Sequence, residues 1–313
     1  MLAACGGGSS PPLAATGPIS QASHSWHARP WISPAAKKSD LLYISDDGNY
    51  KVYIYSYPKA NLLGTLDSAY GSPGGMCVDK SGNIFIAEFN GYDVLEYAHG
   101  GTTPIAVLTD PGQPVGCSLD PTSGNLAVSN EYGPSGGYGD IEIYTGAQGS
   151  PQTYYTDPNI MSGIHFCAYD NQGNLFVDGT TRYNQFALAE LPKGSSAFTY
   201  IALSQTINTP GGIQWDGKYV ALGDEGANPS VIYQLAITGS SATVVGTTTL
   251  SSTSRVRTFW IPDVGSSKKQ GRRVIAPSIY GTVGYYSYPG GGSPTKTFSQ
   301  NQPFAPVVSK GKK

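Results

Sequence analysis

The chain has 313 residues, and only 13% of them are charged, against roughly 25% in an average globular domain. Gly, Pro and Tyr number 41, 23 and 22 while Met numbers 3, which excludes a helical bundle and argues against a doubly wound α/β enzyme. A formal net charge of −2 removes any general attraction to nucleic acid, so no nucleic-acid partner is expected.

The N-terminal residues form a Leu-Ala-Ala-Cys motif at residues 2–5, and a Gly-, Ser- and Pro-rich stretch extends from there to about Ala36. The motif looks like the lipobox of bacterial lipoproteins, which implies a lipid on Cys5 and a signal peptide, whose charged and apolar segments would precede Leu2. We therefore expect a tether over residues 1–36 and a folded domain over residues 37–313. Trp26 and Trp31 are unusual in a linker and are expected to dock on this domain.

These N-terminal features also predict where the protein acts. The expected partner is a membrane, reached through the lipid anchor, and the expected location is the bacterial cell envelope, facing the periplasm or the exterior. No segment has 18 uninterrupted apolar residues, so we expect no membrane-spanning helix.

A phrase with a period of about 46 residues recurs after Asp40, at 72–88, 113–130, 161–179 and 209–224, with a weaker copy at 255–278. An Asp closes the first strand of each copy, and a turn containing Gly follows it. These acids are Asp79, Asp120, Asp170, Asp216 and Asp263. An apolar second strand, a Tyr-containing third strand and a short fourth strand, such as 104–108 or 197–203, complete the unit. Four antiparallel strands at this period predict a β-propeller blade.

The two ends of the chain complement each other. Residues 41–47 read as a second strand without a first, and residues 302–313 read as a first strand without a second. Ser309 lies 46 residues after Asp263, in phase with the repeat. We predict an all-β, six-bladed β-propeller of four-stranded antiparallel blades, with the ring closed by the C-terminal strand joining the N-terminal blade.

The repeated phrase, P-x-G-x-x-x-D-x-x-G-N-[IL]-x-[VI], resembles the NHL repeat of the six-bladed TolB-like propellers over about 270 residues. The resemblance implies the fold and says little about activity, because propellers host many functions. Metal-dependent, gluconolactonase-like hydrolases of similar fold carry Glu, Asn and Asp at the starts of inner strands. Here those positions lie in residues 73–75, 114–116 and 210–212, which read PGG, PVG and PGG, so no metal and no cofactor is expected.

Histidines and cysteines give no catalytic or metal-binding spacing. His165 lies in an inner strand, and we interpret it as a hydrogen-bonded residue of the channel wall rather than a base. Cys77, Cys117 and Cys167 lie two or three residues before the Asp of three successive first strands. A disulfide would join at most two of them, and we predict three buried thiols.

The loops between second and third strands form the candidate binding site. Alternation of strand direction places all six at one end of the channel, which we call the loop mouth. Tyr rings with amides and carboxylates suit sugars, peptides or cationic groups, although ordinary turns also favour Asn, Asp and Gly. The candidate ligand-binding residues are Asp46, Asn49, Tyr50, Glu88, Asn90, Tyr92, Asn130, Glu131, Tyr132, Arg182, Tyr183, Glu225, Asn228 and Tyr280. Twelve acids and three bases fall at this mouth, which predicts an acidic surface opposite a basic, membrane-facing one.

We therefore predict a lipid-anchored extracytoplasmic propeller that binds a protein, peptide or glycan and performs no catalysis. The main alternative is a metal-dependent lactonase- or lyase-like hydrolase with its site in the central channel. A third possibility is a purely structural spacer in the envelope.

Overall fold

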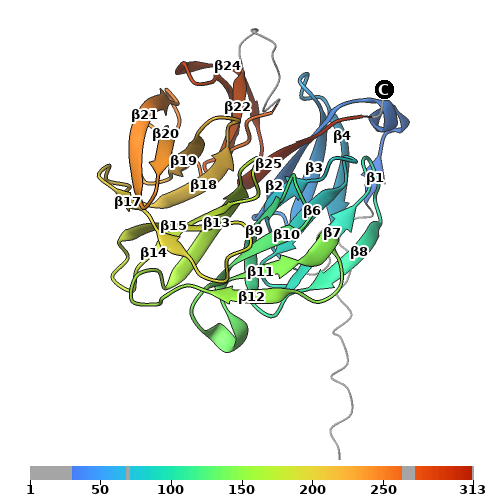
Figure 1. Ribbon diagram of the computed structural model, residues 1–313. Coiled ribbons are helices and arrows are strands. Elements are labelled where there is room, and N and C mark those ends of the chain that lie inside the picture. The colour runs from blue at the N-terminus through green and yellow to red at the C-terminus, as the bar shows by residue number, and fades with distance from the viewer. Residues whose placement is uncertain (1–29, 68–70, 263–271, 312–313) are drawn as a thin grey trace, which may run out of the picture.

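The computed structural model describes residues 30–67, 71–262 and 272–311. Six sheets follow one another in chain order around a central channel and form a β-propeller with six blades (Figure 1). Three short 3-10 helices interrupt the strands: η1 (Pro34–Lys38), η2 (Pro134–Gly136) and η3 (Thr145–Ala147). In the part of the chain that the structure describes, no helix has the length and apolar character needed to cross a membrane.

The first three blades have the following strands, given from the channel outward. Blade 1 contains β25 (Pro303–Ser309), β2 (Leu41–Asp46), β3 (Lys51–Ser56), β4 (Leu62–Asp67) and β1 (Trp31–Ile32). Blade 2 contains β5 (Pro73–Val78), β6 (Ile84–Glu88), β7 (Asp93–Tyr97) and β8 (Pro104–Thr109). Blade 3 contains β9 (Gln113–Leu119), β10 (Leu126–Tyr132), β11 (Asp140–Tyr144) and β12 (Gln152–Tyr155).

The remaining blades follow the same order with more variation. Blade 4 contains β13 (Gly163–Tyr169), β14 (Leu175–Thr180), β15 (Phe186–Leu191) and β16 (Thr199–Tyr200). Blade 5 contains β18 (Pro210–Trp215), β19 (Val220–Asp224), β20 (Val231–Thr238), β21 (Ser241–Thr249) and β17 (Ala202–Leu203). Blade 6 contains β22 (Arg273–Ser278), β23 (Thr282–Ser287) and β24 (Gly291–Ser299).

The C-terminal strand closes the ring as predicted. β25 pairs antiparallel with β2, from Leu41 opposite Ser309 to Asp46 opposite Pro303 (Figure 1). The inner edge of blade 1 is therefore covered by a strand from the far end of the chain. The inner edge of β2 is therefore not left open for another chain to join, and the remaining edge of the blade, on β25, faces the channel.

The inner strand of blade 6 is reduced to a single bridge. Trp260 and Ile275 exchange two backbone hydrogen bonds, of 2.9 and 2.8 Å. Beside this bridge the side-chain amide of Gln214, in blade 5, donates to the carbonyl of Ile261 and accepts from its N–H, at 3.1 and 2.7 Å. The side-chain amide of Gln214 thus makes the two hydrogen bonds that a backbone peptide group makes in a regular strand pair. These bonds connect the inner part of blade 6 to blade 5.

Two outer strands differ from the simple four-strand scheme. The stretch 197–203, predicted to be one fourth strand, divides between two blades: β16 pairs with β15 of blade 4, and β17 pairs in parallel with β21 of blade 5. Trp31 and Ile32, in the expected tether, pair with β4 as a fifth strand of blade 1. Trp26 and Cys5 lie outside the described residues.

The hydrophobic core consists of six clusters, each between two neighbouring blades. Successive residues of a strand point to opposite sides, so a strand between two other blades buries both of its faces. In β2, Leu41 and Tyr43 pack toward blade 2, whereas Leu42 and Ile44 pack toward blade 6. This explains why second strands are apolar throughout while outer strands such as β21 alternate.

The turns after the inner strands are organised as the repeat predicts. Asp79, Asp170 and Asp216 each accept two backbone N–H bonds from their own turn, at 2.7–2.9 Å. The Gly of these turns has a φ between +87° and +94°, which a side chain rarely tolerates. Asp263 and its turn lie outside the described residues.

Candidate functional site

A cavity of about 350 Å³ opens on the channel axis at the loop mouth. Its lining combines the rings of Phe89, Phe166 and Phe304 with several charged side chains. We call it the axial cavity. Gly74 and Val115 contribute little side-chain volume at the starts of two inner strands, which leaves room for it.

The charged wall of the axial cavity is an ion-pair network that joins blades 5, 6 and 1. One oxygen of Glu225 lies 3.0 Å from Arg255 and 3.6 Å from Arg257. Arg257 also lies 4.0 Å from Asp47 and stacks over the ring of Phe304 at 5.2 Å. These side chains hold one another in place and present guanidinium N–H groups in a fixed arrangement.

Blades 3 and 4 contribute Glu131 and His165 to the lining of the axial cavity. Burial raises the pKa of Glu131, and the charge of Arg257 partly offsets this rise. Burial lowers the pKa of His165, so its imidazole is neutral at pH 7. His165 lines the cavity and has a ring contact with Phe166 at 6.3 Å, and its ring nitrogens make no hydrogen bond among the described residues.

A second, larger hollow of about 690 Å³ runs outward over blades 3, 4 and 5, and we call it the outer groove. Tyr132, the last residue of β10, and Tyr138, on the loop between β10 and β11, line one side of it. Arg182 and small polar side chains from blades 4 and 5 line the other side. Glu131 and His165 line both hollows, so the axial cavity and the outer groove adjoin at these two residues.

Three of the candidate residues from the sequence are closed off inside the blades. Asp46 accepts hydrogen bonds from Asn49, Gln300 and Gln302, and Asn130 donates to two buried carboxylates. Glu88 is 1% exposed. These side chains hold the loops rather than face a ligand.

The other candidates divide between the two hollows and the surrounding rim. Glu131, Tyr132, Arg182 and Glu225 line the hollows. Exposed side chains outside both hollows are Asn49, Tyr50, Asn90, Tyr92, Tyr183, Asn228 and Tyr280. Our reading of the sequence missed Phe89, which directly follows β6, and Arg257 and Phe304, which come from the inner-strand side of blades 6 and 1. The Arg-Val-Arg run at 255–257 was the available signal for Arg257.

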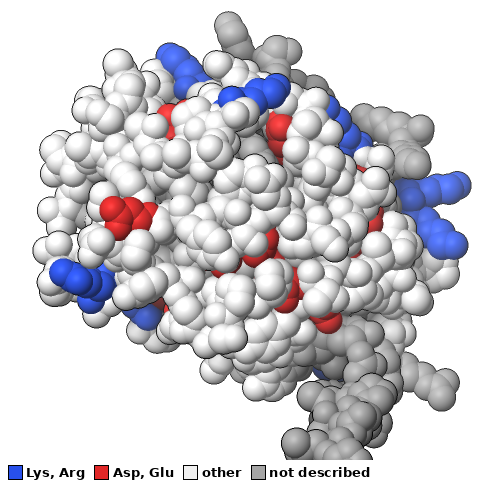
Figure 2. Space-filling view, turned by 60° about the horizontal axis from the view of Figure 1, so that its bottom comes forward, with Lys and Arg blue, Asp and Glu red and all other residues white. Residues whose placement is uncertain are grey.

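The loop mouth is much less acidic than predicted. Seven of its twelve acids are buried: Asp46, Glu88, Asp110, Asp140, Asp178, Asp224 and Glu225. The buried acids bind backbone or side-chain groups at the ends of strands, so they contribute little surface charge. Figure 2 shows a face on which charged side chains are few and scattered among uncharged ones.

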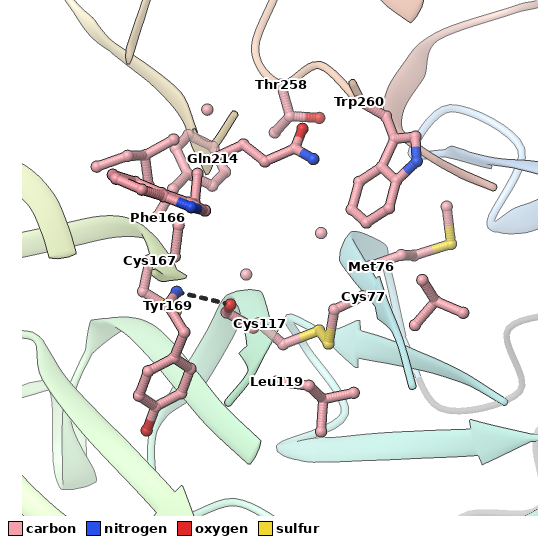
Figure 3. A pocket seen from close by; sticks show the side chains of 18 of the residues that line it. Met76, Cys77, Cys117, Leu119, Phe166, Cys167, Tyr169, Gln214, Thr258 and Trp260 are labelled. Atoms are coloured by element: carbon pink, nitrogen blue, oxygen red, sulfur yellow. Dashed lines mark hydrogen bonds between the residues drawn. A yellow bond between two sulfur atoms is a disulfide. The ribbon is translucent and has the colours of Figure 1, made fainter. Parts of the chain in front are cut away.

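The opposite end of the channel, which we call the turn mouth, corrects the prediction of three thiols. Cys77 and Cys117, from the inner strands of blades 2 and 3, form a disulfide with Cα atoms 5.6 Å apart. Figure 3 shows it in the wall of a cavity of about 420 Å³, with Trp260 and Met76 nearby and Cys167 on another part of the wall. Cys167 is the free thiol among the described cysteines, and burial raises its pKa to about 12.

Among the described residues, no three side chains of His, Cys, Asp or Glu come together in a way that could hold a metal ion. The buried acids near Asn130 are bonded to amide and hydroxyl groups instead.

Comparison with known proteins identifies the fold and nothing finer. No family model matches the chain, and no curated protein matches it in sequence. A chain in the crystal structure of the nidogen/laminin complex superposes with a TM-score of 0.66 at 11% identity, over 87% of this chain and 98% of that one. A functionally unknown protein from Desulfotomaculum acetoxidans DSM 771 gives a TM-score of 0.56 at 11% identity, over 84% and 81%.

A third structure, the dihydro-heme d1 dehydrogenase NirN in complex with DHE, gives a TM-score of 0.50 at 14% identity, over 90% of this chain and 57% of that one. Identities this low carry information about the fold alone. Together with the blade order described above, they make this chain a six-bladed β-propeller.

Proposed function

We propose that the protein is a lipid-anchored, extracytoplasmic propeller that binds another molecule at its loop mouth and carries out no catalysis. The observation that carries the proposal is that the axial cavity and the outer groove lie next to each other at the loop mouth and share Glu131 and His165 in their walls. A large concave site with aromatic walls and a few polar groups in fixed positions is the usual form of a ligand site. Protein, peptide and glycan ligands are the classes that such a mouth accommodates.

Two further features support export and anchoring. The Cys77–Cys117 disulfide suits an oxidising compartment outside the cytoplasm, because cytoplasmic thiols are kept reduced. The Leu-Ala-Ala-Cys motif at residues 2–5 supports lipidation of Cys5 and attachment to a bacterial envelope membrane.

The repeated phrase with its Asp and Gly turns supports a place among NHL-type, TolB-like propellers.

Blocking the groove tests the binding proposal. Gly137 lines the outer groove with no positive φ, and a Cβ placed there has 3.4 Å to its nearest neighbour, so Gly137→Trp fills the groove without backbone strain. Envelope extracts are separated into glycan, peptide and protein pools and titrated, by surface plasmon resonance, onto the full chain carrying Cys5→Ser. At least one pool should bind, and Gly137→Trp should abolish this binding.

The matched control is Gln152→Trp, which adds the same side chain to an exposed position of β12 outside the groove. It should leave binding unchanged. Equal binding of every pool to Gly137→Trp and to the unsubstituted chain would overturn the proposal. The competing hydrolase would instead bind Ca²⁺ or Zn²⁺ and turn over lactones.

Anchoring is tested separately in a bacterium that expresses the chain behind a lipoprotein signal. Labelling with an alkyne-modified palmitate should mark the full chain and move it to the membrane fraction. Cys5→Ser should remove the label and release the protein, and a label that persists in this variant would overturn lipidation at Cys5.

A further inference from the structure

The formal charges in the adjoining cavity and groove cancel. Asp47, Glu131 and Glu225 contribute −3, while Arg182, Arg255 and Arg257 contribute +3, so the formal charge is 0 with His165 neutral. Most of these charges already have a partner in the protein: Glu225 pairs with Arg255 and Arg257, and Arg257 also faces Asp47. A charged ligand would have to displace these internal partners, so the site favours a ligand without net charge.

The polar groups of the outer groove are mostly uncharged. Ser162, Thr180, Thr181, Asn184 and Asn208 line it. The hydroxyls of Ser162 and Thr181 and the amide of Asn208 each make hydrogen bonds within the protein, whereas the side chains of Thr180, Asn184 and His165 make none among the described residues. Hydroxyls, amides and a neutral imidazole both donate and accept. A ligand with many groups that can both donate and accept hydrogen bonds would complement this lining.

Aromatic rings stand at the edge of the same groove. Tyr132 and Tyr138 line it and are 46% and 61% exposed. The loop that carries them is fixed at both ends, because Asn130 and Asp140 pair across β10 and β11 and are joined by a side-chain hydrogen bond of 2.8 Å. An exposed ring on a fixed loop gives a flat apolar platform that costs little conformational entropy when a ligand packs on it.

From these observations we infer that the ligand is a neutral oligosaccharide, bound with one sugar in the axial cavity and the following sugars along the outer groove against Tyr132 and Tyr138. The inference rests on the proposed function and specifies its ligand. Sugar rings present apolar C–H faces to aromatic rings and hydroxyls to amides, carboxylates and guanidinium groups. A peptide supplies backbone groups but also charged ends and side chains, for which the site, with a formal charge of 0, holds no excess of counter-charge.

The test uses isothermal titration calorimetry with the full chain carrying Cys5→Ser. The probes are the tetrasaccharides of cellulose, starch, chitin and xylan, with tetragalacturonate as a charged sugar and an equimolar mixture of blocked hexapeptides as the peptide. At least one neutral tetrasaccharide should bind, while tetragalacturonate and the peptides should not. Binding should change less than twofold between 50 and 500 mM NaCl, because charge plays no net part in it.

Tyr132→Ala should weaken the binding of the neutral tetrasaccharide about fivefold to tenfold, through loss of the stacking ring. Tyr155→Ala removes an exposed ring from β12, outside the groove, and should have no effect. Both tyrosines are exposed, so neither change threatens the fold. A neutral tetrasaccharide that binds Tyr132→Ala unchanged would overturn the inference.

The remaining outcomes separate the inference from the proposed function. Salt-sensitive binding of the peptides or of tetragalacturonate that Gly137→Trp abolishes would overturn the neutral oligosaccharide and leave the binding module standing. Absence of binding by every probe and by every envelope pool would overturn both.

Discussion

The side-chain amide of Asn130 donates to the carboxylate of Asp140 at 2.8 Å, across the paired strands β10 and β11. The same amide donates to Asp110, from blade 2, also at 2.8 Å. Asn130 and Asp140 are fully buried, and the second oxygen of Asp140 has no partner in the described structure. Acids with no base beside them therefore lie in the contact between blades 2 and 3.

This acid cluster predicts that stability rises as the solution becomes mildly acidic. Burial raises the pKa of Asp140 to about 6 and that of Glu142 to about 7, and the groups that face them are Asp93, Asp110, Asn130, Tyr144 and Thr153. Unfolded Asp and Glu titrate near 3.9 and 4.3, so the folded chain binds more protons between about pH 4 and 7. The stabilisation that protonated Asp140 and Glu142 give the folded chain is complete below about pH 4. It is lost as the pH rises through 6 to 7.

Denaturant unfolding at pH 5 and at pH 8 measures the effect. The free energy of unfolding should be higher at pH 5 by at least about 1 kcal/mol, and the double variant Asp140→Asn, Glu142→Gln should lose most of this difference. Asp157→Asn, an exposed acid of the same blade, serves as the control and should keep it. A double variant with the pH dependence of the unsubstituted chain would show that the cluster is not its source.

Asp178 is predicted to act as a neutral hydrogen-bonding group. One of its oxygens accepts the N–H of Phe166 at 2.9 Å, the other has no partner in the described structure, and burial raises its pKa well above the usual value. At the same position of β2 and β10, Ser45 and Ser129 donate to carbonyls of the next blade, at 2.7 and 2.9 Å. A protonated carboxyl can accept and donate in the same way as these hydroxyls.

Asp178→Asn should therefore change the free energy of unfolding at pH 7 by less than about 1 kcal/mol, because the amide keeps one acceptor and one donor. Asp178→Ala should cost about 1–3 kcal/mol, because the N–H of Phe166 loses its partner. Chemical unfolding of both variants compares the two values, and an Asn variant as unstable as the Ala variant would contradict a neutral Asp178.

The Cys77–Cys117 disulfide is predicted to stabilise the ring. It closes a loop across 40 residues of sequence, for which chain entropy gives a contribution of up to about 4 kcal/mol. The double variant Cys77→Ser, Cys117→Ser should unfold at lower denaturant, whereas Cys167→Ser should keep the disulfide contribution. Alkylation of the unfolded, unreduced chain should leave Cys77 and Cys117 unmodified, and their modification would disprove the bond.

Ring closure by the tail gives the largest expected effect. Deleting residues 302–313 removes β25 and exposes the inner edge of β2, so the chain should lose its cooperative thermal transition or aggregate. Deleting residues 312–313 alone leaves the whole of β25 and should not change the melting temperature. If the longer deletion melts like the intact chain, the closure does not hold the ring.

Local signals in the sequence were sufficient for the fold. The Asp and Gly of each turn act within a few residues, and the tail of the chain carries the same inner-strand phrase, so blade number and closure follow from the repeat alone. The division of 197–203 between blades 4 and 5 was not predictable in this way, because β17 pairs with a strand that comes almost forty residues later.

The site was less predictable because it depends on how neighbouring blades align. Cys117 and Cys167 share a phase, each lying three residues before its Asp, while Cys77 lies two before Asp79, and nothing within one blade says which pair meets. Asp178 and Asn130 read as exposed loop residues in the sequence, but they lie at strand ends that the next blade covers. Contacts of this kind become visible only when the blades are placed side by side.

Both described ends of the chain lie in blade 1, and this determines how the ring would carry a mechanical load. A pull from the N-terminal side reaches the propeller through β1, which is held to β4 by Trp31 opposite Thr65 and Ile32 opposite Gly64. This two-residue strand would peel away first, and the four strands behind it would remain paired to one another. Tension between an envelope membrane and a captured ligand would then be absorbed at the outer edge of one blade, and the loop mouth would keep its shape.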